Sequence, residues 1–224
     1  MYTVVTFSYL LLPLALFLAK GQWKSVVPIL LAAYGIFCFT YLYIDAERVP
    51  KAYQAVYAFS FTSIEYLVFA GLFFAALKTK SFRQIILGLS AAFLCFQVFS
   101  YLNNNGREFR LDTISIGIET ILVFVYTFLF FYENMKSNTP INLYNSFAFW
   151  IAVGILTYLG VSFFLYILAN DMNNEEIDLY WPVTFVAETI KNLVFCVAIL
   201  KYGSKPNDSK KNLSHSQGNV PHLI

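Results

Sequence analysis

The sequence predicts an all-α membrane protein, a seven-transmembrane-helix bundle. Three observations support this fold class. Of the 224 residues, 58% are hydrophobic and only 12% are charged, roughly half the 25% charge that is typical of soluble domains. The apolar residues gather in runs of about 20, the length that a helix needs to cross a bilayer. These runs are too long and too uniformly apolar for the alternating strands, about 10 residues each, of a membrane β-barrel.

Seven such runs follow one another, and each ends at charged residues or at a polar loop. We expect membrane-spanning helices at residues 3–19, 25–44, 55–77, 84–102, 113–132, 146–169 and 180–200. The first run is expected to stay in the membrane, because its first base is Lys20 and a cleavable signal peptide carries its basic residues before the apolar core. Pro13 and Pro28 fit inside the first two spans, because neighbouring groups can satisfy the carbonyls that a proline frees.

Two parts of the chain are expected, a seven-helix domain at 1–201 and a tail at 202–224. The tail is polar and rich in Gly, Pro, Ser, Asn and Lys. A segment of that composition buries too little apolar surface to fold by itself, so we expect a disordered cytoplasmic tail.

Lysine and arginine indicate the orientation, because they concentrate in cytoplasmic loops. One side of the predicted bundle holds Lys20, Lys24, Lys78, Lys80, Arg83, Lys136, Lys201, Lys205, Lys210 and Lys211. The other side holds Arg48, Lys51, Arg107 and Arg110, together with the acids Asp171, Glu175, Glu176 and Asp178. The prediction is an N-terminus outside and a C-terminus inside, in a plasma membrane. The short loops favour a bacterial inner membrane.

Spans 2–3, 4–5 and 6–7 read as three copies of one two-helix hairpin, preceded by one added peripheral helix. The first helix of each copy contains small residues, as at 32–35, 90–92 and 152–154. The second helix carries one glutamate, Glu65, Glu119 or Glu188, at a similar depth. Parallel repeats are related by an axis along the membrane normal. The three glutamates are therefore expected to face one another.

An ionisable group in hydrocarbon costs roughly 2.5–3.5 kcal/mol on insertion scales, so each of these glutamates marks a functional site by default. Lys191 and Asn192 lie on the same helix face as Glu188, and Lys191 is close enough at i, i+3 to pair with it. The candidate ligand-binding residues are Glu65, Glu119, Glu188, Lys191 and Asn192.

Two interpretations of this polar centre stay open. It is either a structural core held by a Glu–Lys pair, or a cavity open to the outside that binds a cation, a proton or an amine-bearing ligand. Carboxylate oxygens suit hard cations such as Ca²⁺, Mg²⁺ or Mn²⁺. The metal and cofactor stay unassigned. No predicted span contains His or Asp, which excludes haem ligation by His, a His–carboxylate di-iron site and Ser–His hydrolysis within the spans.

The predicted topology resembles that of seven-helix sensors and opsins. Opsins carry a lysine on the seventh span and a carboxylate on the third, the spans that hold Lys191 and Glu65 here. The sequence departs from opsins because Glu188 lies three residues before Lys191, where opsins have an Asp four residues before, and because the third-span arginine pattern is absent around Glu65. A looser likeness to the membrane modules of bacterial seven-helix sensors covers the topology alone and transfers no site residues.

The functional prediction is a polytopic membrane protein that senses or translocates a small ligand or cation through the glutamate cluster. Two alternatives remain, a membrane-embedded lipid-modifying enzyme and a structural partner subunit of a membrane complex. The expected partners are the lipid bilayer, a small cation or amine, and a membrane or cytoplasmic protein. The net charge of +2 gives no reason to expect nucleic acid.

Overall fold

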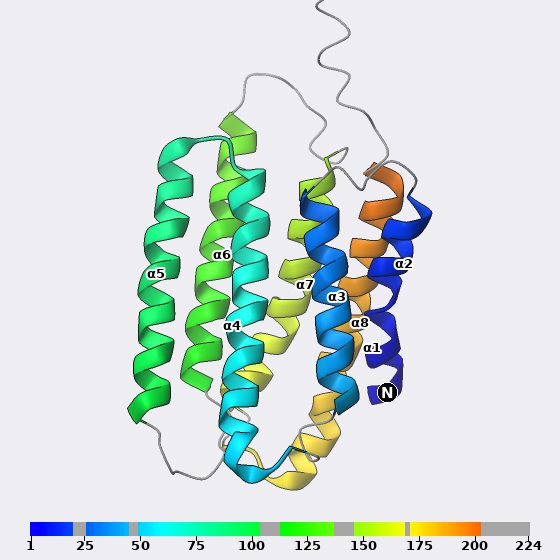
Figure 1. Ribbon diagram of the computed structural model, residues 1–224, viewed down its shortest axis with the longest axis vertical. Coiled ribbons are helices and arrows are strands. Elements are labelled where there is room, and N and C mark those ends of the chain that lie inside the picture. Colours follow the sequence, from blue (N-terminus) through cyan, green and yellow to red (C-terminus); the bar gives the residue numbers. More distant parts are fainter. Residues whose placement is uncertain (20–25, 45–48, 104–112, 137–145, 169–170, 203–224) are drawn as a thin grey trace, which may run out of the picture.

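The computed structural model describes residues 1–19, 26–44, 49–103, 113–136, 146–168 and 171–202. Within these ranges every regular element is a helix, so the all-α prediction is confirmed for them. The helices run alternately up and down as an elongated bundle (Figure 1). They are α1 (Tyr2–Ser8), α2 (Leu11–Leu18), α3 (Val26–Ile44), α4 (Lys51–Ala76), α5 (Lys80–Asn103), α6 (Thr113–Lys136), α7 (Phe147–Leu168) and α8 (Asn174–Tyr202). The predicted tail lies outside the described residues except for Tyr202, where α8 ends.

Six of these helices, α3 to α8, are long and apolar enough to cross a membrane. They coincide with six of the seven predicted spans and support a multi-pass membrane protein. The first predicted span differs, because the apolar stretch Tyr2–Leu18 is broken into the two short helices α1 and α2.

The break between α1 and α2 follows from Pro13. Proline has no backbone N–H, so the carbonyl of Tyr9, four residues earlier, loses its usual helical donor. Leu12 N donates to that carbonyl instead, over 3.3 Å. The same oxygen lies against Gly35 of α3, where an added Cβ would be only 2.6 Å away. Gly35 therefore allows the corner between α1 and α2 to approach α3 closely.

The first segment lies at one edge of the bundle (Figure 1) and contributes Val5, Tyr9 and Leu12 to the core. α1 and α2 both pack against α3 and α8. α8 in turn packs closely on α7, where a Cβ at Gly154 would lie 2.8 Å from the Phe195 ring. The three glutamate-bearing helices consequently form no simple ring around an axis: α4 packs against α6, whereas the main neighbours of α8 are α7, α2 and α1.

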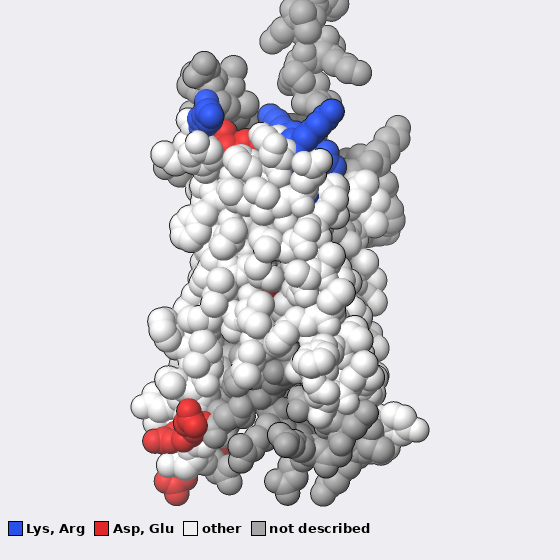
Figure 2. Space-filling model, turned by 90° about the vertical axis from the view of Figure 1, so that its left-hand side faces the viewer, with Lys and Arg blue, Asp and Glu red and all other residues white. Residues whose placement is uncertain are grey.

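Charge separates to the two ends of the bundle (Figure 2). We call the end with Lys78, Lys80, Arg83, Lys136 and Lys201 the basic end, and the end with Asp171, Glu175, Glu176 and Asp178 the acidic end. Glu133 is the acid at the basic end, where its carboxylate accepts hydrogen bonds from the backbone N–H groups of Lys78 and Thr79. The flank between the two ends is almost free of charge (Figure 2), as a bilayer-facing surface requires.

Candidate functional site

The five residues predicted as a site all lie in the interior of the bundle. Glu65 on α4, Glu119 on α6 and Glu188 on α8 keep between 4% and 8% of their surface exposed, and Lys191 and Asn192 on α8 keep none. Charged side chains are almost never fully buried in proteins unless they are paired. The partners of each one therefore decide what this centre can do.

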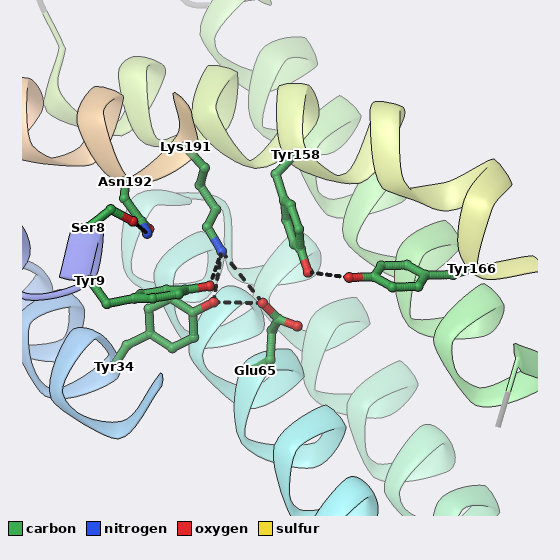
Figure 3. A network of polar contacts seen from close by, with 8 residues as sticks. All are labelled: Ser8, Tyr9, Tyr34, Glu65, Tyr158, Tyr166, Lys191 and Asn192. Atoms are coloured by element: carbon green, nitrogen blue, oxygen red, sulfur yellow. Dashed lines mark hydrogen bonds and ion pairs between the residues drawn. The ribbon is translucent and has the colours of Figure 1, made fainter. Parts of the chain in front are cut away.

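Lys191 is bound by groups from three other elements (Figure 3). Its Nζ lies 3.7 Å from Glu65 Oε1. It donates hydrogen bonds to the hydroxyl of Tyr34 on α3, at 2.9 Å, and to that of Tyr9 at the α1–α2 break, at 3.4 Å. The Tyr34 hydroxyl donates in turn to Glu65 Oε1, at 2.6 Å. The pair and the two tyrosines thus join four separate segments of the chain.

Aromatic rings enclose the same ammonium group. Lys191 Nζ lies 4.0 Å from the ring centre of Tyr158 on α7, and between 5.1 and 5.7 Å from those of Tyr9, Tyr34 and Phe69. A cation within about 6 Å of a ring face is attracted by the ring quadrupole, more strongly when water is excluded. Together with Glu65, these rings surround the Lys191 side chain in the interior.

The expected pair between Lys191 and Glu188 is not the ion pair that forms. Residues at i and i+3 are neighbours on a helix surface, so the spacing allows a pair but does not decide which acid the lysine meets. Lys191 extends toward Glu65, whereas Glu188 lies within hydrogen-bonding reach of the Tyr9 and Tyr158 hydroxyls. Lys191 still acts on Glu188 electrostatically, but its direct partner is on α4.

Glu119 has the fewest partners of the three glutamates. Glu65 and Lys191 are close enough to affect it electrostatically. Its Oε1 is buried, yet it has no hydrogen-bond partner among the described residues. An unpaired ionised carboxylate in the interior carries a penalty of several kcal/mol, so Glu119 is the least compensated acid of the centre.

Asn192 connects the centre to α1. Its Nδ2 donates to Ser8 Oγ at 2.8 Å, and the Ser8 hydroxyl donates to the Val5 carbonyl at 2.6 Å. Asn192 Oδ1 is buried and has no hydrogen-bond partner in the described part of the chain. Asn192 therefore contributes to packing between α1 and α8 and leaves one acceptor available.

The sequence analysis missed the tyrosines and the serine of this centre, namely Ser8, Tyr9, Tyr34, Tyr158 and Tyr166. The Tyr158 and Tyr166 hydroxyls lie 3.4 Å apart (Figure 3). A tyrosine in the middle of an apolar span is a usable signal, because a buried phenol O–H needs a partner. With 16 tyrosines in the chain, however, that signal selects no particular residue.

The cleft of about 320 Å³ near the acidic end lies between α3 and α4, away from the glutamates. Its lining includes Phe37, Tyr41, Tyr53 and Tyr57. Within the described residues, no group of three or more His, Cys, Asp or Glu side chains gathers as metal ligands would. This cleft is therefore not the open cavity that was expected at the glutamates. Binding of a ligand at the glutamates stays a prediction.

The chemistry of the site follows from its own side chains. It combines one enclosed lysine, three buried carboxylates and a set of tyrosine hydroxyls. It can hold protons or small cations and can pass protons between hydroxyl and carboxyl oxygens. Comparison with protein-family models, with curated proteins and with solved structures finds no match to this chain.

Proposed function

We propose that this multi-pass protein lies in a plasma membrane and uses its buried charged centre to bind protons or a small cationic ligand, in order to sense or translocate it. The observation that carries the proposal is a charge imbalance. Among the buried side chains of the described residues, three carboxylates face a single ammonium group. Since isolated charges are expensive to bury, two further positive charges must be bound for the centre to be neutral.

The partners of the glutamates suggest where those positive charges are bound. Glu65 has Lys191 as its counter-ion. Among the described residues, Glu188 has the neutral hydroxyls of Tyr9 and Tyr158 within hydrogen-bonding reach, and one oxygen of Glu119 has no hydrogen-bond donor. Glu188 and Glu119 are therefore the two positions that take up the proton or cation, whereas Glu65 is paired with Lys191.

A thermal unfolding experiment on detergent-purified protein tests this function. A ligand that binds only the folded state stabilises it by about 2.7 kcal/mol at a hundredfold excess over its dissociation constant. The melting temperature should rise with lower pH, with a small cation or with a simple amine, and the rise should shrink in Glu119→Gln. The control is Tyr126→Phe, which removes a buried hydroxyl on the same helix. If the melting temperature responds to none of these additions, the proposal fails.

The orientation follows from the two ends of the bundle. Lysine and arginine gather in cytoplasmic segments, so the basic end faces the cytoplasm and the acidic end faces outward. Impermeant thiol labelling from outside the cell should modify a cysteine introduced at Asn174 and spare one at Lys80. The opposite pattern would reverse the orientation. The short connections between the helices fit a bacterial inner membrane.

One observation favours a second candidate, a structural subunit of a membrane complex. Lys191 is completely enclosed and fully paired, as a purely architectural core would be. In that case the melting temperature would not respond to ions or amines. Glu119→Gln combined with Glu188→Gln would raise stability, because neutral amides replace buried acids.

A further inference from the structure

The surroundings of the charged centre differ along the bundle axis. On α8, the buried polar side chains Thr184, Glu188, Lys191 and Asn192 lie around the middle of the helix. Beyond Asn192, toward the basic end, the next buried residues of α8 are apolar. The charged centre is therefore flanked by different surroundings on its two sides.

Toward the basic end, the helices around Lys191 close with apolar side chains. α4, α7 and α8 contribute buried residues of the same hydrophobic core, namely Phe69, Phe73, Ile151, Ile155, Phe195 and Ile199. The Phe195 ring is in close contact with the backbone of α7 at Gly154. Such a packed apolar layer offers a proton no hydrogen-bonding group and water no polar partner.

Toward the acidic end, α7 presents a polar stripe. Tyr158, Ser162 and Tyr166 are spaced by four residues, so they share one helix face over about 12 Å. The Tyr158 hydroxyl is within reach of Glu188 and lies 3.4 Å from the Tyr166 hydroxyl. Ser162 Oγ is buried and has no hydrogen-bond partner in the described ranges. Tyr166 is only partly buried, and its ring packs edge-on against Trp181 at 5.7 Å.

The titratable groups around this route come from six elements. Glu188 faces Lys191 on its own helix, Glu65 on α4, Tyr9 at the α1–α2 break and Tyr158 on α7. Tyr166 faces Tyr158 and is influenced by all three glutamates, including Glu119 on α6. On α3, Tyr34 and Cys38 lie close to Glu65. The ammonium of Lys191 is the single positive charge among these groups.

We infer that the centre exchanges protons with the acidic end alone, through Tyr166 and Tyr158, and therefore works as a one-sided proton sensor. This inference rests on the proposed function and deepens it by naming the ligand and its side of entry. A transporter has to open its site to both sides of the membrane in turn. The packed apolar layer leaves this centre connected to one side.

The transfer balances without any co-reactant. A proton from water binds the Tyr166 oxygen while the original Tyr166 proton moves to the Tyr158 oxygen. The original Tyr158 proton then moves to a Glu188 carboxylate oxygen. Each hydroxyl ends with one proton, no covalent bond between heavy atoms changes, and the net result is a neutral Glu188. Rotation of the two hydroxyls restores the starting arrangement for the next proton.

Infrared spectroscopy of the full chain in sealed liposomes tests the inference. Glutamic acid protonation produces a carboxyl C=O stretching band that Glu188→Gln and Glu119→Gln would assign. The orientation in the liposomes is read from impermeant labelling of a cysteine at Asn174, and the pH is stepped on the external side only. The band should grow on acidification where the acidic end faces the external solution, and should not change where it faces the buffered lumen.

Substitutions then test the route. Tyr166→Phe should slow the growth of the band about tenfold, the loss of one hydrogen-bonding group from the path. Tyr126→Phe is the matched control and should leave the rate unchanged. An equal response from both sides, or a response through the basic end, would overturn the one-sided sensor while leaving proton binding intact. An unchanged rate in Tyr166→Phe would overturn the tyrosine route. A band that titrates from neither side would remove the proposed proton function itself.

Discussion

Two polar clusters lie in the interior of this bundle, one neutral and one charged, and they satisfy their groups in different ways. The neutral cluster joins α4, α5 and α6. The Tyr66 hydroxyl lies 2.9 Å from Ser90 Oγ and 2.8 Å from the Tyr126 hydroxyl. Hydroxyl groups both donate and accept, so these three residues satisfy one another.

The charged cluster around Lys191 does not close in the same way. It keeps two acceptors without hydrogen bonds in the described residues, Glu119 Oε1 and Asn192 Oδ1. It also holds more acid than base. Helix association in lipid requires only a few such hydrogen bonds, and the neutral cluster supplies them. The comparison shows that the neutral cluster satisfies its own hydrogen bonds, whereas the charged cluster keeps two acceptors that it does not satisfy among the described residues.

The largest effect should come from removing the lysine of the charged cluster. Lys191→Met leaves Glu65 buried without its counter-ion, and breaking a buried pair in this way typically costs about 3–5 kcal/mol. The free energy of unfolding in detergent, measured with a denaturant, should fall by that amount. No single substitution in the neutral cluster should lower the free energy of unfolding by as much.

A second substitution identifies the true partner. Lys191→Met combined with Glu65→Gln should be clearly milder than Lys191→Met alone, because no unpaired charge remains between α4 and α8. The double variant Lys191→Met with Glu188→Gln should recover less of the lost free energy of unfolding. Equal rescue by both would mean that Lys191 is shared evenly, against the 3.7 Å contact with Glu65.

The same substitution in each cluster gives the next effect. Tyr34→Phe removes hydrogen bonds to Glu65 and Lys191, and bonds to charged groups contribute about 1.5–3 kcal/mol. Tyr126→Phe removes a bond between neutral hydroxyls, which contributes about 1 kcal/mol. Unfolding free energies should separate the two variants in that order. If Tyr126→Phe lowers the free energy of unfolding more than Tyr34→Phe does, the neutral cluster contributes more to the stability of the bundle.

The last substitution concerns how the charged cluster is positioned. Gly35→Ala places a methyl group 2.6 Å from the Tyr9 carbonyl, and overpacking of this kind costs about 1–3 kcal/mol. Gly88 of α5 is the matched control, because a Cβ there meets nothing within 4 Å. Gly88→Ala should be neutral or slightly stabilising, since Ala is the better helix former. Comparable losses in both variants would show that the corner at Tyr9 has room to move.

The sequence predicts the helices well because a membrane span has a strong local signal. Apolar runs about 20 residues long identify α3 to α8 with small errors at their ends. The first span was predicted as one helix because prolines are common in membrane helices. Its break depends on the contact between Tyr9 and Gly35, two residues that are distant in the sequence and carry no pattern that links them.

The candidate site was found only in part for a similar reason. Glu65, Glu119, Glu188 and Lys191 are visible because charge is rare in apolar segments. Which glutamate meets Lys191 is decided by how α8 is rotated against α4, and no local spacing reports that rotation. The i, i+3 spacing favoured Glu188, but the packed helices bring Glu65 closer.

The contacts between the two ends of the chain have a consequence for biogenesis. Tyr9 and Ser8 are synthesised well before their partners Lys191 and Asn192, which follow them by 182 and 184 residues. Until the last helix is inserted, Glu65 lies in the membrane without its lysine. A chain that lacks α8 therefore keeps Glu65 without a counter-ion in the membrane. Insertion of α8 supplies the counter-ion, Lys191.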